Sequence, residues 1–458
     1  MNQPNIIFIL CDDLGINDLH CYGREDHCTP NLDRLAREGT RFTSAYASQA
    51  ICSASRAGIL TGLNPARLHL TTFLPGRPDA ASQRVLHPEI MMHVPLSIKT
   101  WPRYFKELGY VTGLIGKWHI GSEPGPREHG FDFVYHPGDA KDTEPSASEG
   151  GKAEFELTGE TLRFIEENRD QPFVAYLGHF TPHIPYCARA DLVEKHKDAF
   201  EPVYAALVET LDTTVGLLLD KLEAYGLAEN TIVVFTSDNG GLHVPELEHQ
   251  RVTHNTPFRA GKGYVYEGGQ RVPLIVRWPG RVPAGRVIDT PVNNVDWIPT
   301  LMELAGASPP DGLDGVSFAA GLLGGDMPER PLFWHFPHYT NQGGRPSGAM
   351  REGDWLLVEM YDEARAELYD LSADIGESLD LSVEEPGRLA AMRAALEAWR
   401  QSNDVQSNTP NPECDEAFFR RLYIDTDPSR FDPLTADTAQ WQTIQEWRQG
   451  MNAATRKT

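Results

Sequence analysis

Cysteine, positive charge and long apolar runs are all scarce in this chain. Six cysteines are spread over 458 residues, and no Cys-x-x-Cys pair is present, which excludes a zinc ribbon and a dense disulfide framework. Only 41 Lys and Arg stand against 65 Asp and Glu, a formal charge of −24. The basic surface that a nucleic acid or an anionic membrane requires is therefore missing. No apolar run approaches the roughly 18–20 residues of a membrane helix.

The start of the chain carries no recognisable export signal. The apolar run at residues 6–10 is too short for a signal peptide and leads directly into two aspartates. We expect a cytoplasmic protein, or a periplasmic one if a leader has been removed, with no nucleic-acid or membrane partner.

Short β-branched runs alternate with helical stretches over the first 330 residues. Strands are expected at residues 5–10, 110–115, 173–177, 231–236 and 272–278, and helices at 53–60, 100–108, 154–168, 203–225 and 295–304. Alternation of this kind favours a mostly parallel sheet with helices on both faces. The fold class expected is therefore α/β, a large mixed, mostly parallel sheet sandwiched by helices.

The pattern changes after residue 330. Short strands at 332–334, 349–350, 355–360 and 367–369, followed by a helix at 388–400, indicate a smaller α+β unit on an antiparallel sheet. We divide the chain into a catalytic domain (1–330), a small C-terminal domain (331–402) and a tail (403–458). The tail is expected to wrap the body or a second subunit, which suggests a homo-oligomer.

Polar side chains follow four of the expected strands. They are Asp12 and Asp13 after the first, Lys117 and His119 after the second, His179 and His183 after the third, and Asp238 and Asn239 after the fourth. Ligands of open α/β sheets bind beyond the carboxyl ends of the strands, so we expect one crevice lined by these groups. A single strand-end Asp or Asn is usually a turn former, but four such ends together indicate a site.

The oxygen-bearing side chains suit a hard divalent cation. Asp12, Asp13, Asp238 and Asn239 would leave coordination positions for a nucleophile and a substrate oxygen. Around them Lys117, His119, His183, Lys262 and Arg56 could stabilise a tetrahedral oxyanion.

Cys52 opens a helix, with Arg56 one turn further along. A thiol at a helix N-terminus could be a nucleophile of lowered pKa, or simply a small residue that starts the helix.

As a set, these motifs resemble the type I sulfatase family of the alkaline-phosphatase-like superfamily. The signature is Cys52-Ser53-Ala54-Ser55-Arg56, continuing to Thr61-Gly62, although Ala54 stands where the commonest form has Pro. Supporting motifs surround Asp12-Asp13, Gly116-Lys117-Trp118-His119, Pro182-His183, Ser237-Asp238-Asn239-Gly240 and Gly261-Lys262-Gly263. The resemblance covers about residues 4–400.

The resemblance implies a formylglycine-dependent sulfatase, arylsulfatase-like in activity. A maturation enzyme would oxidise Cys52 to formylglycine, whose hydrate attacks the sulfur of a small-molecule sulfate ester, aryl or carbohydrate. The metal implied is Ca²⁺, with Mg²⁺ or Mn²⁺ as alternatives, held by Asp12, Asp13, residue 52, Asp238 and Asn239. The implied catalytic residues are Cys52, Arg56, Lys117, His119, His183 and Lys262.

Two alternatives stay open. The same constellation could act on phosphonate monoesters or phosphodiesters, because a metal and cations do not by themselves select sulfur over phosphorus. The chain could also be an unmodified, metal-stabilised binding protein, which the intact catalytic set argues against.

The alcohol half of the ester is weakly encoded. Candidates for its contacts, each of which could equally be loop filler, are His69, Thr71, Phe73, Arg77, His93, His335, His338 and Tyr339.

Overall fold

The computed structural model describes residues 3–137, 151–247 and 250–455. Its strands are β1 (Asn5–Asp12), β2 (Thr40–Tyr46), β3 (Val85–Leu86), β4 (Val111–Gly116), β5 (Phe133–Tyr135), β6 (Phe173–Pro182), β7 (Thr231–Ser237), β8 (Arg271–Arg277), β9 (Arg286–Ile288), β10 (Val292–Asn293), β11 (Leu332–Phe336), β12 (Ser347–Glu352), β13 (Trp355–Met360), β14 (Arg365–Asp370) and β15 (Thr409–Pro410). Its α-helices are α1 (Pro30–Glu38), α2 (Cys52–Thr61), α3 (Trp101–Glu107), α4 (Glu154–Asn168), α5 (Ala190–Lys195), α6 (Pro202–Ala224), α7 (Glu267–Gln270), α8 (Trp297–Leu304), α9 (Ala319–Leu322), α10 (Pro386–Ser402), α11 (Glu416–Tyr423) and α12 (Thr438–Thr455).

A nine-stranded sheet forms the centre of the molecule. Its order is β10-β2-β8-β7-β1-β6-β4-β5, and β9 pairs with β2. Strand β8 runs antiparallel to both of its neighbours, whereas the other pairings are parallel. The expected large, mixed and mostly parallel sheet is confirmed.

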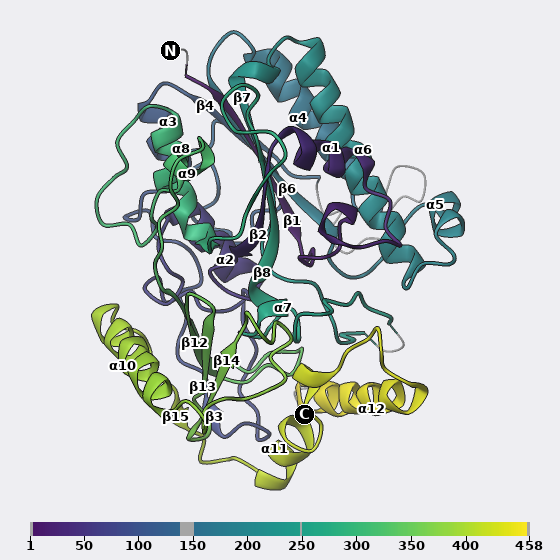
Figure 1. Ribbon diagram of the computed structural model, residues 1–458, viewed down its shortest axis with the longest axis vertical. Coiled ribbons are helices and arrows are strands. Elements are labelled where there is room, and N and C mark those ends of the chain that lie inside the picture. The colour runs from purple at the N-terminus through teal and green to yellow at the C-terminus, as the bar shows by residue number, and fades with distance from the viewer. Residues whose placement is uncertain (1–2, 138–150, 248–249, 456–458) are drawn as a thin grey trace.

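Helices cover both faces of this sheet (Figure 1), with α1, α4 and α6 on one side and α2, α3, α8 and α9 on the other. Successive residues of β1 divide between the two faces. Ile7 and Ile9 pack into the core under the first helix group, and Ile6 and Phe8 into the core under the second. A strand buried on both faces reads as a continuous apolar run, which is why the sequence located β1.

Helix α6 is long and apolar enough, by length and composition alone, to cross a membrane. In this structure 72% of its most apolar window is buried inside the protein, so it serves here as a core helix.

The second sheet is antiparallel, in the order β11-β12-β13-β14. One face packs under α10, where Leu357 and Leu368 meet Met392 and Leu396. The other face, which includes Trp334, joins the core of the main sheet. The small antiparallel sheet and its covering helix are confirmed.

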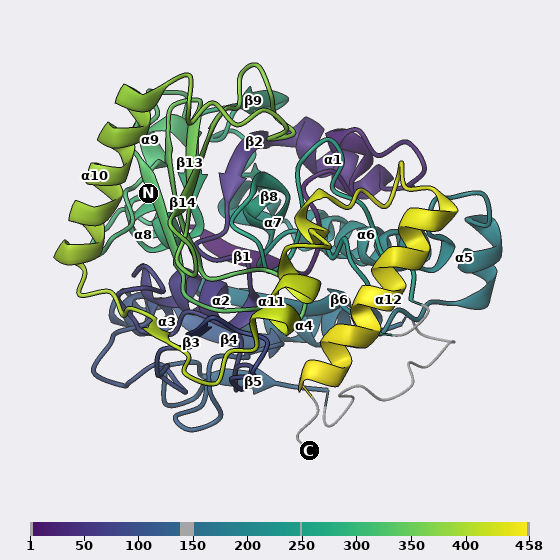
Figure 2. The same ribbon diagram turned by 90° about the horizontal axis from the view of Figure 1, so that it is seen from below.

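The tail folds back onto the body of its own chain. Phe419 of α11 and Trp447 of α12 pack with Val244 and Tyr339. In Figure 1, α10, α11 and α12 gather at the lower end of the main sheet, where β1 ends, and Figure 2 looks onto that end. The three-part division of the chain and the homo-oligomer stay predictions.

Candidate active site

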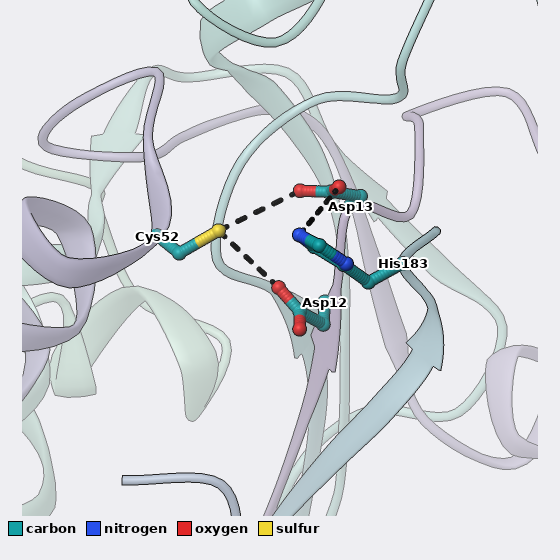
Figure 3. A group of neighbouring side chains, drawn as sticks. All are labelled: Asp12, Asp13, Cys52 and His183. Carbon is teal, nitrogen blue, oxygen red and sulfur yellow. Dashed lines mark hydrogen bonds and ion pairs between the residues drawn. The ribbon is translucent and has the colours of Figure 1, made fainter. Parts of the chain in front are cut away.

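The carboxyl end of β1 delivers two carboxylates to the N-terminus of α2. Cys52 Sγ lies 3.3 Å from Asp12 Oδ1 and 3.7 Å from Asp13 Oδ1 (Figure 3). Asp13 has a positive φ of 65°, which turns the chain sharply as the strand ends. All three residues are at most 2% exposed, so the cluster is shielded from bulk water.

Two lysines neutralise these carboxylates. The ammonium of Lys117, which directly follows β4, is paired with Asp12 Oδ2. Lys262 Nζ lies 2.7 Å from Asp13 Oδ2, at the opposite side of the pair. Each aspartate therefore has its own cation, as a buried charge requires.

Arg56 lies beneath this pair, fully buried on α2. Its Nε donates to Asp238 Oδ2 at 2.8 Å and its Nη1 donates to the Lys117 carbonyl at 3.3 Å. The other oxygen of Asp238 accepts from the Asp13 amide at 3.2 Å. Arg56 thus connects the ends of β1, β4 and β7.

Three further side chains complete the cluster. Asn239 Nδ2 donates to Asp13 Oδ1 at 2.8 Å. His183 Nδ1 donates to the Ile184 carbonyl at 2.6 Å, which directs its Nε2 to within 3.6 Å of Asp13 Oδ2. His119, at a positive φ of 62°, has a buried Nδ1 with no partner in the described part of the chain.

Burial and the neighbouring charges shift the pKa values of the three carboxyl groups in different directions. Burial raises the pKa of Asp12, but Lys117, His183 and Arg56 outweigh it and hold that pKa well below its usual range. The pKa of Asp13 is lowered in the same way, by Lys262 and His183 against burial. For Asp238, burial dominates over Arg56 and raises the pKa to about 7, with Asp12 adding to the rise.

The imidazoles are kept neutral. Burial lowers the pKa of His119 well below its ordinary value, and Lys117 adds to the effect. Burial and Lys262 likewise lower the pKa of His183. Both rings can therefore accept a proton without first losing one.

Of the two readings left open for Cys52, the structure does not support a thiol of lowered pKa. Burial and the Asp238 carboxylate raise its pKa well above the ordinary value, and Lys262 and Lys117 do not offset this. An unmodified thiol here stays protonated near neutral pH and is a poor nucleophile.

The donor set fits a hard divalent cation. Ligand atoms of Asp12, Asp13, Cys52 and His183 lie within 4.8 Å of one another. Asn239 Oδ1 is buried beside them and accepts no hydrogen bond within the described residues. Carboxylate and amide oxygens are the ligands that Ca²⁺ and Mg²⁺ take in proteins.

Several candidates for substrate contact serve other purposes. Thr71 Oγ1 and His338 Nε2 lie 2.7 Å apart, His335 interacts with Tyr361 and with the Gln406 carbonyl, and Tyr339 donates to Asp362. His179 is fully buried, and neither ring nitrogen has a partner among the residues described. These side chains hold the body together.

Sequence reasoning missed Tyr176. Its buried hydroxyl lies close enough to Arg56 to interact with it, and it comes from the middle of β6. A tyrosine inside an apolar strand gives no signal that sets it apart from core residues.

A mostly parallel α/β sheet with a charged cluster at its strand ends defines a hydrolase of the alkaline-phosphatase-like fold. The profile of the sulfatase family matches residues 4–307, and that of the N-sulphoglucosamine sulphohydrolase C-terminal region matches residues 260–399. The chain belongs to the sulfatase family, and it is a sulfuric ester hydrolase.

Curated relatives agree with this assignment. The chain is 34% identical to dog (Canis lupus familiaris) N-acetylgalactosamine-6-sulfatase over 72% of its own length and 68% of the relative's. It is 31% identical to human arylsulfatase A, covering 82% and 83% of the two chains. A sulfatase of Formosa agariphila is 30% identical, over 90% and 92%.

Solved structures agree as well. Ps i-CgsB in complex with k-i-k-neocarrahexaose superposes over all of both chains with a TM-score of 0.76 at 27% identity. A phosphonate monoester hydrolase of Agrobacterium radiobacter shares the fold, with a TM-score of 0.65 at 19% identity over 87% and 96% of the two chains.

Proposed function

We propose that this enzyme hydrolyses the sulfate ester of a carbohydrate, using formylglycine at position 52 and one bound divalent cation, Ca²⁺. The observation that carries the proposal is the convergence of Asp12 and Asp13 on Cys52 Sγ, with Lys117 and Lys262 on either side. The setting of Cys52 also supports a converted side chain, because burial beside two carboxylates disfavours an anionic thiolate before any cation is bound.

The cation would be held by Asp12, Asp13, Asp238, Asn239 and the side chain at position 52. When bound, it supplies Lewis acidity and neutralises the carboxylates. An aldehyde at position 52 supplies, as its hydrate, an attacking oxygen and a second hydroxyl that allows the product to leave.

The side chains of this chain then have distinct tasks. Lys117 and Lys262 bind the oxygens of the sulfuryl group and stabilise the charge that builds there. Asp238 accepts the proton of the attacking hydroxyl. Lys262 and His183 assist the leaving alcohol oxygen: the Lys262 ammonium supplies the proton, because the neutral His183 ring holds its own proton on Nδ1 and has none at Nε2 to donate.

Release of sulfate requires a second proton transfer. His119, neutral and unpaired at Nδ1, takes the proton of the remaining hydroxyl at position 52. Arg56 orients the nucleophile through the hydrogen bond that fixes Asp238.

The cluster's own charges favour an anionic substrate. Three aspartates and three basic side chains (Arg56, Lys117 and Lys262) cancel, so a divalent cation leaves the centre at about +2. A positive centre inside a protein of charge −24 binds a sulfate ester while the outer surface does not. Names of relatives, such as N-acetylgalactosamine-6-sulfatase, support a sugar as the alcohol half.

The test combines mass spectrometry with a substrate panel. In protein from its native host, the peptide that contains residue 52 should carry formylglycine, which requires a maturation enzyme as partner. Aryl and carbohydrate sulfates should be hydrolysed, and phosphonate monoesters at least tenfold more slowly. EDTA should abolish turnover, and Ca²⁺ should restore it better than Mg²⁺ or Mn²⁺.

Variants distinguish the nucleophile from a mere structural cysteine. Cys52→Ala should lower kcat at least 1000-fold, whereas Cys414→Ala, a half-buried cysteine in the tail, should keep wild-type activity. Full activity with unmodified Cys52, or in Cys52→Ala, would contradict the mechanism. Faster turnover of phosphonate esters would instead favour the phosphonate hydrolase alternative.

A further inference from the structure

The turn at residues 340–343 lies directly against the loop that carries Lys262. A Cβ atom on Gly263 would lie 2.7 Å from Gln342 Oε1 and 2.9 Å from Thr340 Oγ1. Tyr264 OH donates to the Gln342 carbonyl at 2.6 Å. A charge placed on this turn therefore acts next to the lysine that faces the sulfate group.

Three charged side chains converge on the turn from distant parts of the chain. Arg77 Nη1 donates to the Thr340 carbonyl at 2.9 Å. Arg448 Nη1, from α12, donates to the Asn341 carbonyl at 2.5 Å. Glu246, from the loop after β7, accepts a hydrogen bond from Gln342 Nε2.

The two guanidinium groups lack counter-ions. Arg77 is 8% exposed and Arg448 is 3% exposed, yet neither forms an ion pair with a carboxylate within the residues that the structure describes. Arg77 Nε and Nη2 have no hydrogen-bond partner within the described ranges, whereas Arg448 Nε and Nη2 both donate to the uncharged Asn452 Oδ1. Buried charges without partners are costly, so an unpaired pair of arginines points to an anion that is supplied from outside.

Glu246 is the acidic side chain that acts on both Lys262 and Arg448. It is half-buried, and its hydrogen bond goes to Gln342 rather than to either arginine, so it only partly offsets them. The three side chains together carry one excess positive charge.

We propose that Arg77, Arg448 and Glu246 form a charge-selecting subsite for the alcohol half of the ester, which favours a saccharide that carries a second anionic group. That group is a carboxylate or a second sulfate, attracted by the arginines and opposed by Glu246. The inference rests on the proposed function, and it gives α12 of the tail a part in substrate selection. Buried charges act over several ångströms here because little water screens them.

The test is that removing an arginine and removing Glu246 should change the preference for an anionic substrate in opposite directions. The probes are 3-carboxyphenyl sulfate and its neutral isostere 3-carbamoylphenyl sulfate, with benzene-1,3-disulfate to separate a second sulfate from a carboxylate. For each enzyme, kcat/KM for the anionic probe is divided by kcat/KM for the neutral one. Comparing this ratio between variants cancels the intrinsic reactivity of the leaving groups.

Arg77→Gln and Arg448→Gln should each lower the ratio about tenfold, and Glu246→Gln should raise it by a similar factor. All three effects should shrink in 0.5 M salt. Arg286→Gln, on the edge strand β9, is the matched control and should leave the ratio unchanged. General damage to the fold cannot produce shifts of opposite sign.

An unchanged ratio in all three variants, or shifts of one sign, would overturn the subsite. So would a wild-type enzyme that hydrolyses the sulfate-ester panel but none of the three probes. Absence of hydrolysis across the whole panel would instead overturn the proposed function. The anionic probe whose ratio falls more in Arg77→Gln and Arg448→Gln identifies which anion the subsite prefers.

Discussion

Arg56 illustrates how much of this site depends on a single buried cation. Its guanidinium contacts Asp238 and the Lys117 carbonyl and approaches Asp12 at 3.8 Å, with no exposure to solvent. Removing one member of a buried ion pair leaves the other charged and unpaired, which is far costlier than the loss of a surface pair.

We therefore expect Arg56→Met to lower the free energy of unfolding by about 3–5 kcal/mol, measured by urea denaturation. Arg34→Met, which removes partly exposed pairs with Glu38 and Asp220, should cost less than about 1 kcal/mol. Equal losses in the two variants would show that Asp238 does not depend on Arg56.

Individual site residues were largely predictable, because each follows a strand whose apolar run is readable. Asp12, Lys117, His183 and Asp238 come together at one sheet edge as expected. The pKa of Cys52 was not predictable, since it depends first on the burial of the thiol and then on Asp238, 186 positions away in the chain. The ring of His335 contacts residues 26 and 71 positions away, and that of His338 contacts Thr71, 267 positions away, so their packing role could not be recognised from the sequence.

Gly116, at the end of β4, lies directly against the backbone of β6 beside the site. Gly116, at φ 98°, lies where a Cβ atom would come within 2.0 Å of the Gly178 carbonyl oxygen. Lys117, the next residue, donates its amide to that same oxygen at 2.8 Å. The glycine thus sets both the strand spacing and the position of Lys117, for which we propose a catalytic role.

Gly116→Ala should destabilise the protein by about 3 kcal/mol or more and lower kcat, because the strands must separate and Lys117 must move. Gly109→Ala is the matched control: its φ is 86°, but no atom lies within 4 Å of the added Cβ. That variant should lose only about 1–2 kcal/mol, with unchanged kcat. Thermal unfolding and steady-state kinetics check both, and a Gly116→Ala enzyme with normal kcat would refute the positional role.

Helices and strands whose apolar residues form a clear pattern were predicted well. Elements whose pattern is faint were missed. Strands β1, β4, β6, β7 and β8 lie where the sequence indicated them. Strand β2 (TRFTSAY) was missed because its polar residues hide the alternation, although it pairs with β8 in the centre of the sheet. Helix α11 was missed because eight residues in a polar tail carry too little pattern.

The whole molecule should be sensitive to acid through its buried histidines. Burial lowers the pKa of His179 to about 3 and that of His243 and His335 to about 4. Since these values lie below those of the unfolded chain, near 6.5, the unfolded state binds more protons in between. Stability is therefore full above pH 6.5 and is lost as the pH falls towards 4.

His179→Phe should remove one such group. Relative to wild type, the variant should gain about 2–3 kcal/mol of unfolding free energy when the pH is lowered from 6.5 to 4.5, whatever its stability at neutral pH. His20→Gln, at an exposed ring, should show a smaller change. A constant difference between His179→Phe and wild type across this range would contradict a neutral, buried His179.

The packing of the tail against the 340–343 turn also affects the order in which the protein is completed during synthesis. Cys52 and the start of α12 are separated by roughly 390 residues, and synthesis proceeds at about 5–20 residues per second. Helix α12, whose Arg448 contacts the 340–343 turn, is therefore synthesised roughly 20–80 s after residue 52. For the conversion that we propose at position 52, this interval is the time in which the Cys52 segment, 2% exposed in the finished protein, would be within reach of a maturation enzyme.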